Sequence, residues 1–116
     1  MNILLINHYA GSPRHGMEFR PYYLAREWVR MGHRVQIVAG SWSHIRAQQP
    51  LMPPARHCDE IIDGISYRWY ATPGYLGNGV GRVRSMLSFL WHLRRDGKGL
   101  ARDFKPDVVI ASSTYP

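Results

Sequence analysis

The fold is decided by residues 2–40, which read NILLINHYAGSPRHGMEFRPYYLAREWVRMGHRVQIVAG. The segment opens with a continuous apolar run, which is typical of a strand that helices cover on both faces. After a glycine-bearing loop, residues 21–31 repeat apolar side chains at helical spacing. Pro21 suits a first helical turn because its missing N–H costs nothing there, and Gly32 offers a positive-φ stop before a second apolar strand at residues 35–39. The segment therefore predicts a strand–loop–helix–strand unit with two parallel strands.

A hairpin and a long helix are predicted further along the chain. Asp63-Gly64 is a favoured two-residue turn, so residues 60–62 and 65–70 are expected to pair, with the first arm as a short edge extension. Residues 80–104 predict a helix whose internal glycines introduce a break or kink. The apolar stripe expected to face the core comprises Val83, Met86 or Leu87, Leu90, Leu93, Gly97, Leu100 and Phe104.

With a last buried strand at residues 108–111, the predicted fold class is α/β. We expect a Rossmann-like open parallel sheet of about four strands, ordered 3-2-1-4, with helices on both faces. The 116 residues suit one domain or part of one, and the end of the chain just after a strand suggests a fragment. Cys58 is the single cysteine, which excludes a disulfide framework and agrees with a reducing compartment. No stretch approaches the roughly 20 apolar residues of a membrane span, so a cytoplasmic protein is expected.

The charge balance favours a negatively charged partner. The chain carries a formal charge of +7, and nearly all of its basic residues are arginines, which suit bidentate contacts with phosphate and carboxylate. The basic residues form no nucleic-acid recognition motif, so nucleic acid is not expected as a partner. The six histidines lack zinc-like spacing, so neither a metal nor another cofactor is expected.

The first loop is the candidate ligand site. Gly11 and Gly16 have the spacing of half a P-loop, but Met17 and Glu18 replace the residues that hold phosphate and magnesium there. Glycines still let the backbone approach a ligand, and the helix start behind them favours an anion. A tight turn with solvated side chains is the alternative. The expected substrate-binding residues are Gly11, Ser12, Arg14, His15, Gly16 and Arg20, together with Ser113 and Thr114 at the end of the last strand.

Other polar residues near this edge of the sheet have open roles. His8 ends the first strand and suits either the core or contact with an acceptor, and Glu18 suits the positive end of the helix dipole.

The second helix is strongly basic. With Lys105 it carries seven basic and two acidic side chains, and two aromatic residues lie away from its predicted apolar stripe. Such a helix can dock on anionic lipid headgroups, although it can equally be a solvated helix whose aromatics pack under the preceding loop. The expected membrane-facing residues are Arg82, Arg84, Phe89, Trp91, Arg94 and Arg95.

Three segments, GMEFRPYYLAREWVRMGHRV, DGISYRWY and KPDVVIASS, give the chain a family resemblance. In their order and spacing the chain resembles the N-terminal part of bacterial family-four glycosyltransferases with the GT-B fold. The most similar subgroup builds O-antigen and capsular polysaccharides and includes L-fucosamine transferases. The resemblance implies two Rossmann-like domains, retaining transfer from a nucleotide sugar, an acceptor that is often lipid-linked, and no metal requirement.

The resemblance also assigns roles to parts of this chain. Residues 1–116 would form the acceptor-side domain, while a missing C-terminal domain would hold most donor contacts and a two-glutamate motif. The chain alone would then be inactive, and its catalytic residues stay unknown. The loop from Gly11 to Gly16 would face the donor phosphates and the acceptor across the cleft. Residues 112–115 carry hydroxyl groups where many relatives have a histidine, so no histidine role is transferred. The alternative function is a non-catalytic α/β binding or interaction module.

Overall fold

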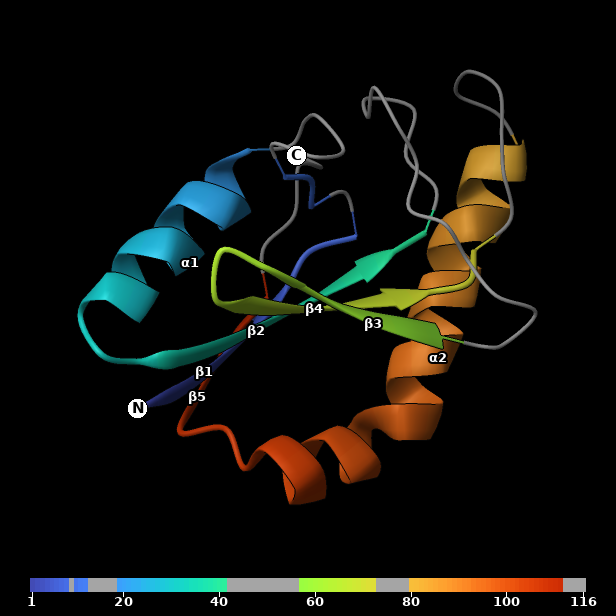
Figure 1. Cartoon of the computed structure of the whole chain (residues 1–116). Helices are drawn as coiled ribbons and strands as arrows, with labels where there is room; N and C mark the ends of the chain where they lie inside the picture. Colours follow the sequence, from blue (N-terminus) through green and yellow to red (C-terminus); the bar gives the residue numbers. More distant parts are fainter. Residues whose placement is uncertain (9, 13–18, 42–56, 73–79, 112–116) are drawn as a thin grey trace.

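One mixed β-sheet with a helix on each face forms the chain, as Figure 1 shows. The computed structural model describes residues 1–8, 10–12, 19–41, 57–72 and 80–111. In chain order the elements are β1 (Asn2–Ile6), α1 (Arg20–Arg30), β2 (Arg34–Gly40), β3 (His57–Ile62), β4 (Ile65–Tyr70), α2 (Val80–Phe104) and β5 (Val108–Ala111). The order of the described strands is β3-β4-β2-β1-β5, and among their four pairs only β3–β4 is antiparallel. The α/β class and the predicted order of the four parallel strands are therefore confirmed.

The β1–α1–β2 unit forms as the opening residues predict. Pro21 lies in the first turn of α1, where no intrahelical partner is lost. Gly32 has a φ of 94°, which supplies the left-handed residue that ends the helix. In the β1–β2 pair, Leu4 lies opposite Gln36 and Ile6 opposite Val38, so both strands end at the same edge of the sheet.

The predicted hairpin joins β3 and β4. Asp63 and Gly64 have φ values of 51° and 81°, as a type I′ turn requires. The Tyr22 hydroxyl of α1 donates a hydrogen bond to Asp63, which fixes the helix to the turn. The first arm was expected as a short extension, but it is a six-residue strand at the sheet edge. The sheet is therefore mixed, and its described part has five strands.

The two faces of the sheet bury separate apolar clusters, as alternation along the strands requires. Tyr22 and Ala25 of α1 cover the face that contains Leu5, Ile37 and Tyr67. On the other face, α2 covers the cluster that comprises Leu4, Val38, Tyr70, Phe89, Leu100 and Phe104. The prediction of helices on both faces is confirmed.

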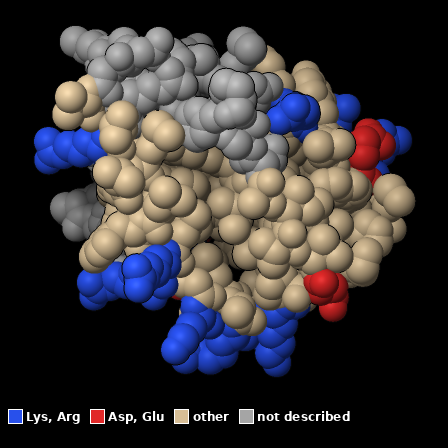
Figure 2. All heavy atoms as spheres, turned by 180° about the vertical axis from the view of Figure 1, so that it is seen from behind, with Lys and Arg blue, Asp and Glu red and all other residues tan. Residues whose placement is uncertain are grey.

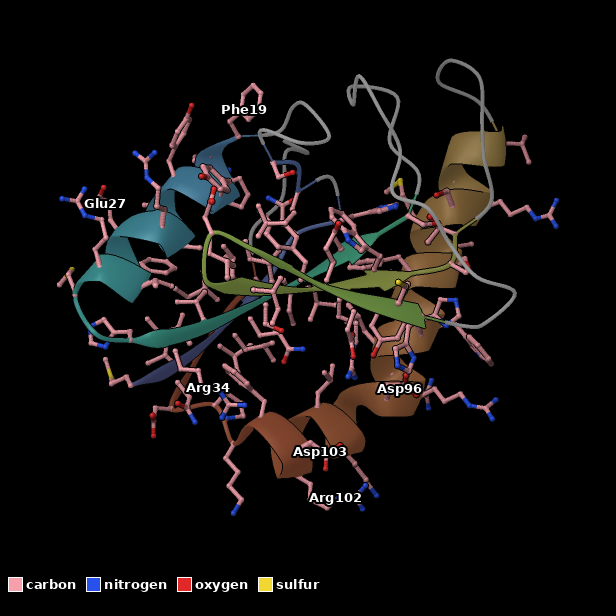
Figure 3. All side chains as sticks on the ribbon, in the orientation of Figure 1. Phe19, Glu27, Arg34, Asp96, Arg102 and Asp103 are labelled. Atoms are coloured by element: carbon pink, nitrogen blue, oxygen red, sulfur yellow. The ribbon has the colours of Figure 1, made fainter. Side chains whose placement is uncertain are left out.

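Helix α2 is continuous but bent. The bend is clear in Figure 1 and lies close to Asp96, which Figure 3 labels. The predicted kink at Gly97 or Gly99 is therefore confirmed, whereas a break does not occur, since the helix runs through both positions. Among the described residues, no helix has the length and apolarity that a membrane crossing requires.

The predicted orientation of α2 is wrong in its N-terminal half. Val83 and Leu90, expected in the core, are more than half exposed, whereas Phe89, expected on the surface, is 4% exposed. The buried stripe here instead includes Ser85 and His92, four residues before and three after Phe89. The prediction placed only apolar side chains in the core, so it turned the helix until these two polar residues faced away from the sheet. The prediction holds at the other end, where Leu100 and Phe104 are buried.

Strand β5 forms one edge of the sheet and is tied to β1 at its beginning. The backbone N–H of Asn2 donates to the Asp107 carboxylate at 2.7 Å, and the Asp107 N–H donates to the Asn2 carbonyl at 2.7 Å. The Asn2 side-chain amide also donates to the carbonyl oxygens of Phe104 and Lys105, at 3.0 and 3.2 Å. Asn2 therefore caps the last turn of α2 and places β5 beside β1.

Candidate functional site

Strands β1, β2 and β4 end at one edge of the sheet, beside the N-terminal half of α2, where open α/β sheets have their ligand crevice. Because these strands are parallel, the residues that follow them meet at one edge of the sheet, which is where α/β proteins bind ligands. His8 follows β1, Ser41 follows β2 and Thr72 follows β4. The candidate site is built around these three positions.

The His8 imidazole forms the floor of this edge. It stacks on the ring of Phe89 in α2, with the ring centroids 4.7 Å apart and the planes 8° from parallel. The His8 Nε2 atom lies 3.4 Å from the Ser85 hydroxyl oxygen, within the range of a weak hydrogen bond. His8 is 6% exposed, so its side chain shapes the floor and holds α2 against the sheet.

Gly40, the last residue of β2, makes room for that imidazole. A Cβ atom at this position would overlap His8 Cδ2 and would lie 2.7 Å from His8 Nε2 and 3.1 Å from the Thr72 hydroxyl oxygen. The Gly40 N–H also donates to the His8 carbonyl at 3.1 Å. The strand end and the histidine can approach this closely only because the residue is glycine.

Hydrogen bonds tie the strand ends together. The Ser41 N–H donates to the Tyr70 carbonyl at 2.8 Å, and the Ser41 hydroxyl oxygen accepts from the Thr72 N–H at 3.0 Å. The Asn7 N–H donates to the Val38 carbonyl at 3.0 Å. These bonds continue the strand pairing past the sheet and give the candidate site a fixed backbone.

On the α2 side of the site, His92 contacts the end of β4. Its Nε2–H donates to the Ala71 carbonyl at 2.8 Å, and its ring stacks on Tyr70 with centroids 5.2 Å apart. Burial raises the pKa of Tyr70, so its phenol stays neutral. The α2 side of the site is therefore aromatic at this point.

The start of the predicted ligand loop is anchored to the sheet. The Tyr67 hydroxyl donates to the Gly11 carbonyl at 2.8 Å, and Gly11 and Ser12 are both buried. Arg20, the first residue of α1, is exposed. The cap position Phe19 makes no side-chain cap hydrogen bond, so no side chain at that position satisfies the first amides of α1.

Several predicted site residues lie outside the described residues, namely Arg14, His15, Gly16, Ser113 and Thr114, and so does Glu18. The Arg82 side chain is also outside this range. Their predicted roles stay predictions.

The outer face of α2 carries both apolar and basic side chains. Val83, Leu87, Leu90 and Trp91 are all more than half exposed. Their spacing of four, seven and eight residues places them on one helical face. Figure 2 shows basic side chains along the side of the molecule that α2 forms, at the left of that view. The exposed basic residues of this face are Arg84, Arg94, Arg95 and Lys98.

Part of this outer face was predicted and part was missed. Trp91 is 52% exposed, and the Arg95 guanidinium lies over its ring at 5.3 Å from the centroid. Phe89 is buried against His8, so its predicted place among the membrane-facing residues is wrong. Besides Trp91, the apolar residues that reach the surface are Val83, Leu87 and Leu90, which the predicted core stripe contained.

Sequence reasoning also missed Gly40, Ser85 and Thr72 as parts of the crevice. Gly40 carries a readable signal, since a glycine at the end of a buried strand indicates close approach of another group. Ser85 and Thr72 carry none, because only the packing of α2 brings Ser85 to His8, and only the pairing of β4 with β2 brings Thr72 to Gly40.

One comparison with known proteins gives a match. The family model described as "Glycosyl transferase 4-like domain" matches residues 15–116, which is most of the chain. No curated protein and no solved structure matches the chain.

Proposed function

The chain belongs to the glycosyl transferase 4-like domain family, and we propose that it is the acceptor-side half of a retaining GT-B glycosyltransferase. The enzyme would move a sugar from a nucleotide-sugar donor to a lipid-linked glycan acceptor. The family match over residues 15–116 is the observation that carries this proposal. The fixed edge at the carboxyl ends of β1, β2 and β4 supports it, because sugar nucleotides bind such edges through their phosphates.

In this proposal the first loop and the start of α1 face the donor diphosphate. The amides at the start of a helix favour negative charge, and Arg14 and Arg20 would add two cationic contacts. The buried His8 and Gly40 lie at the same edge of the sheet. As the donor leaves, preorganised amides and guanidinium groups would stabilise the charge that develops on the nucleotide diphosphate. Ser113 and Thr114 would contact the acceptor from the neighbouring strand end.

The reaction is tested with the protein expressed from its complete coding region. It is incubated with a panel of nucleotide sugars and a polyprenyl-diphosphate-linked glycan, and the anomeric configuration of the product is determined by NMR. We expect transfer with the donor's configuration retained. An inverted product would refute the mechanism, and a lack of transfer from every donor in the panel would refute the activity.

The half-enzyme assignment has a separate test. The 116-residue chain alone is expected to bind the lipid-linked acceptor and to transfer no sugar. Sugar transfer by this chain alone would contradict the assignment of the donor site to another domain.

The role of Arg14 is tested in the complete enzyme. Loss of one charge-assisted hydrogen bond to the developing diphosphate is worth roughly 1.5–3 kcal/mol, so Arg14→Ala is expected to lower kcat by at least about tenfold. Arg30→Ala is the matched control, because Arg30 lies exposed at the other end of α1. Equal kinetics of the two variants would reject the role of Arg14.

We further propose that the outer face of α2 docks on an anionic membrane surface. The apolar side chains Val83, Leu87 and Trp91 can enter the headgroup region while Arg84 and Arg94 contact lipid phosphates. The mixture of exposed apolar and basic residues on one helical face supports this proposal, since a solvated helix would carry polar residues there. Such docking would bring the crevice to acceptors that are anchored in the same membrane.

The docking is tested by co-sedimentation with vesicles. Binding to phosphatidylglycerol-containing vesicles, weakened by salt, is expected for the unaltered chain, with little binding to phosphatidylcholine alone. Trp91→Ala combined with Leu87→Ser should reduce the binding, whereas Tyr23→Ala, which removes an exposed aromatic ring from α1, should not. Equal, salt-insensitive binding to both vesicle types would refute the proposal.

The resemblance to O-antigen and capsule enzymes supports a place in surface polysaccharide synthesis, at the cytoplasmic side of the plasma membrane. The resemblance to L-fucosamine transferases indicates an amino-deoxy sugar as the donor sugar. A panel that includes UDP-linked amino-deoxy sugars tests this, because a preference for a neutral hexose would contradict it.

A further inference from the structure

A polar cavity of about 210 Å³ lies between the sheet and the C-terminal half of α2. The sheet contributes Arg34, Gln36, Ser66 and Arg68, and the last turns of α2 contribute Phe104. Arg34 and Gln36 come from the start of β2, whereas the crevice lies at the other end of that strand. The glycosyl transfer proposed above makes no use of this cavity.

Gln36 is the unusual residue of the cavity wall. It is a polar residue that is only 7% exposed, and its side chain lines the cavity. Ser66, which is partly exposed, lies opposite Gln36 on the neighbouring strand and also lines the cavity. Both side chains can therefore donate hydrogen bonds to a molecule that enters the cavity.

Arg34 gives the cavity its charge. Its guanidinium lies over the Phe104 ring, 4.8 Å from the centroid, and no carboxylate of the described residues lies within ion-pair distance of it. Figure 3 shows Arg34 beside the C-terminal end of α2. Stacking on the ring fixes the orientation of the guanidinium while leaving its N–H groups able to donate.

The other charged residues of the cavity compensate one another. Arg68 donates two hydrogen bonds to the Asp59 carboxylate, at 2.8 and 3.2 Å, and this contact raises the pKa of Arg68. Asp103 is 72% exposed at the rim and pairs with Arg102 at 3.4 Å. Arg34 is therefore the cation that remains uncompensated at the cavity.

We propose that this cavity is a second binding site, for a small molecule that carries an oxyanion. Arg34 would be the cationic contact, and Gln36 and Ser66 would donate hydrogen bonds to the same group. Guanidinium, carboxamide and hydroxyl donors together suit either a carboxylate or a phosphate. The volume exceeds that of a lone ion, since one water occupies roughly 30 Å³ of liquid, so the ligand is a small organic anion.

The site is tested by NMR titration of the 116-residue chain at constant ionic strength. The probes are inorganic phosphate, acetate and, as a neutral control, glycerol. Saturable shifts of the Gln36 side-chain amide are expected with at least one of the two anions. Tighter binding of phosphate would identify a phosphate-bearing ligand, and tighter binding of acetate a carboxylate. A lack of saturation with both anions, or an equal response to glycerol, would mean that water alone fills the cavity and would overturn the proposal.

Two variants that each remove one positive charge distinguish binding at this site from the general attraction of anions to a basic chain. Arg34→Gln is expected to weaken binding about tenfold, as the loss of one charge-assisted hydrogen bond predicts. Arg30→Gln, on the exposed end of α1, should change it less than about twofold. Equal weakening by both variants would overturn the proposal. Gln36→Leu keeps the charge and fills the same position, so weaker binding by this variant gives an independent test.

Discussion

Gly40→Ala is expected to disturb the floor of the crevice. The added Cβ atom would overlap His8 Cδ2 and would lie 2.7 Å from His8 Nε2, closer than real Cβ contacts. The imidazole has little room to move, because it is buried and stacked on Phe89 with ring centroids 4.7 Å apart. Either the ring leaves its stack or the end of β2 shifts.

The size of the effect follows from these contacts. Overpacking of a filled site typically costs about 1–3 kcal/mol. Separation of the His8 and Phe89 rings would forfeit roughly another 0.5–1.5 kcal/mol. Replacement of a strand glycine by alanine returns roughly 0.5–1 kcal/mol, because the unfolded chain loses conformational freedom. A net loss of about 1–3 kcal/mol in the free energy of unfolding is therefore expected.

Urea denaturation of four chains measures this loss: the unaltered chain, Gly40→Ala, His8→Ala and the double variant. In the His8→Ala background the methyl group added at position 40 meets no imidazole ring, so Gly40→Ala should be nearly neutral there. Gly97→Ala is the matched control, since a Cβ at Gly97 meets nothing within 4 Å and should stabilise α2 by up to about 1 kcal/mol. An equal cost of Gly40→Ala with and without the His8 ring would refute the reasoning.

Three further predictions concern contacts that hold the elements together. Tyr22→Phe should cost about 1 kcal/mol, because it removes the hydrogen bond to Asp63. That bond raises the pKa of Tyr22 from its usual value of 10.0, so the folded chain holds the phenol proton more tightly. The loss of stability in Tyr22→Phe should therefore be complete below about pH 10 and fade as the pH rises through the raised pKa, which urea denaturation at several pH values measures. Asn2→Ala should cost about 1–2 kcal/mol and speed hydrogen exchange at the end of α2, whose carbonyl oxygens lose two donors; unchanged exchange there would contradict the capping role. Asp59→Asn should cost less than about 1 kcal/mol, since the Asp59 side chain is 53% exposed, and a cost that is the same in high salt would exclude the ion pair with Arg68 as its source.

Most of the fold could be predicted because its signals are local. The apolar run of β1, the proline and glycine that bound α1, and the Asp63-Gly64 turn each lie within a few residues of what they determine. The order of the parallel strands is that of the doubly wound fold, in which the chain crosses after its third parallel strand, β4, to the far side of β1. The length of β3 could not be read, because its mixed residues become a strand only through pairing with β4.

The candidate site was harder to predict from the sequence because its contacts join residues that lie far apart in the chain. Ser85 and His92 are polar residues buried in the packed face of α2, and their partners His8 and Ala71 lie on other elements. A stripe drawn through apolar residues alone therefore gave the wrong orientation of the helix. The same error placed Phe89 on the surface and Val83 and Leu90 in the core.

Strand β5 has a consequence for handling the chain. Within the described residues it pairs with β1 alone, and its other side presents free backbone groups next to Val109, which is 56% exposed. Edges of this kind recruit strands from other molecules, so aggregation at high concentration is expected to begin there. Val109→Lys would place a charge on that edge, which is the means by which natural sheets keep their borders from growing.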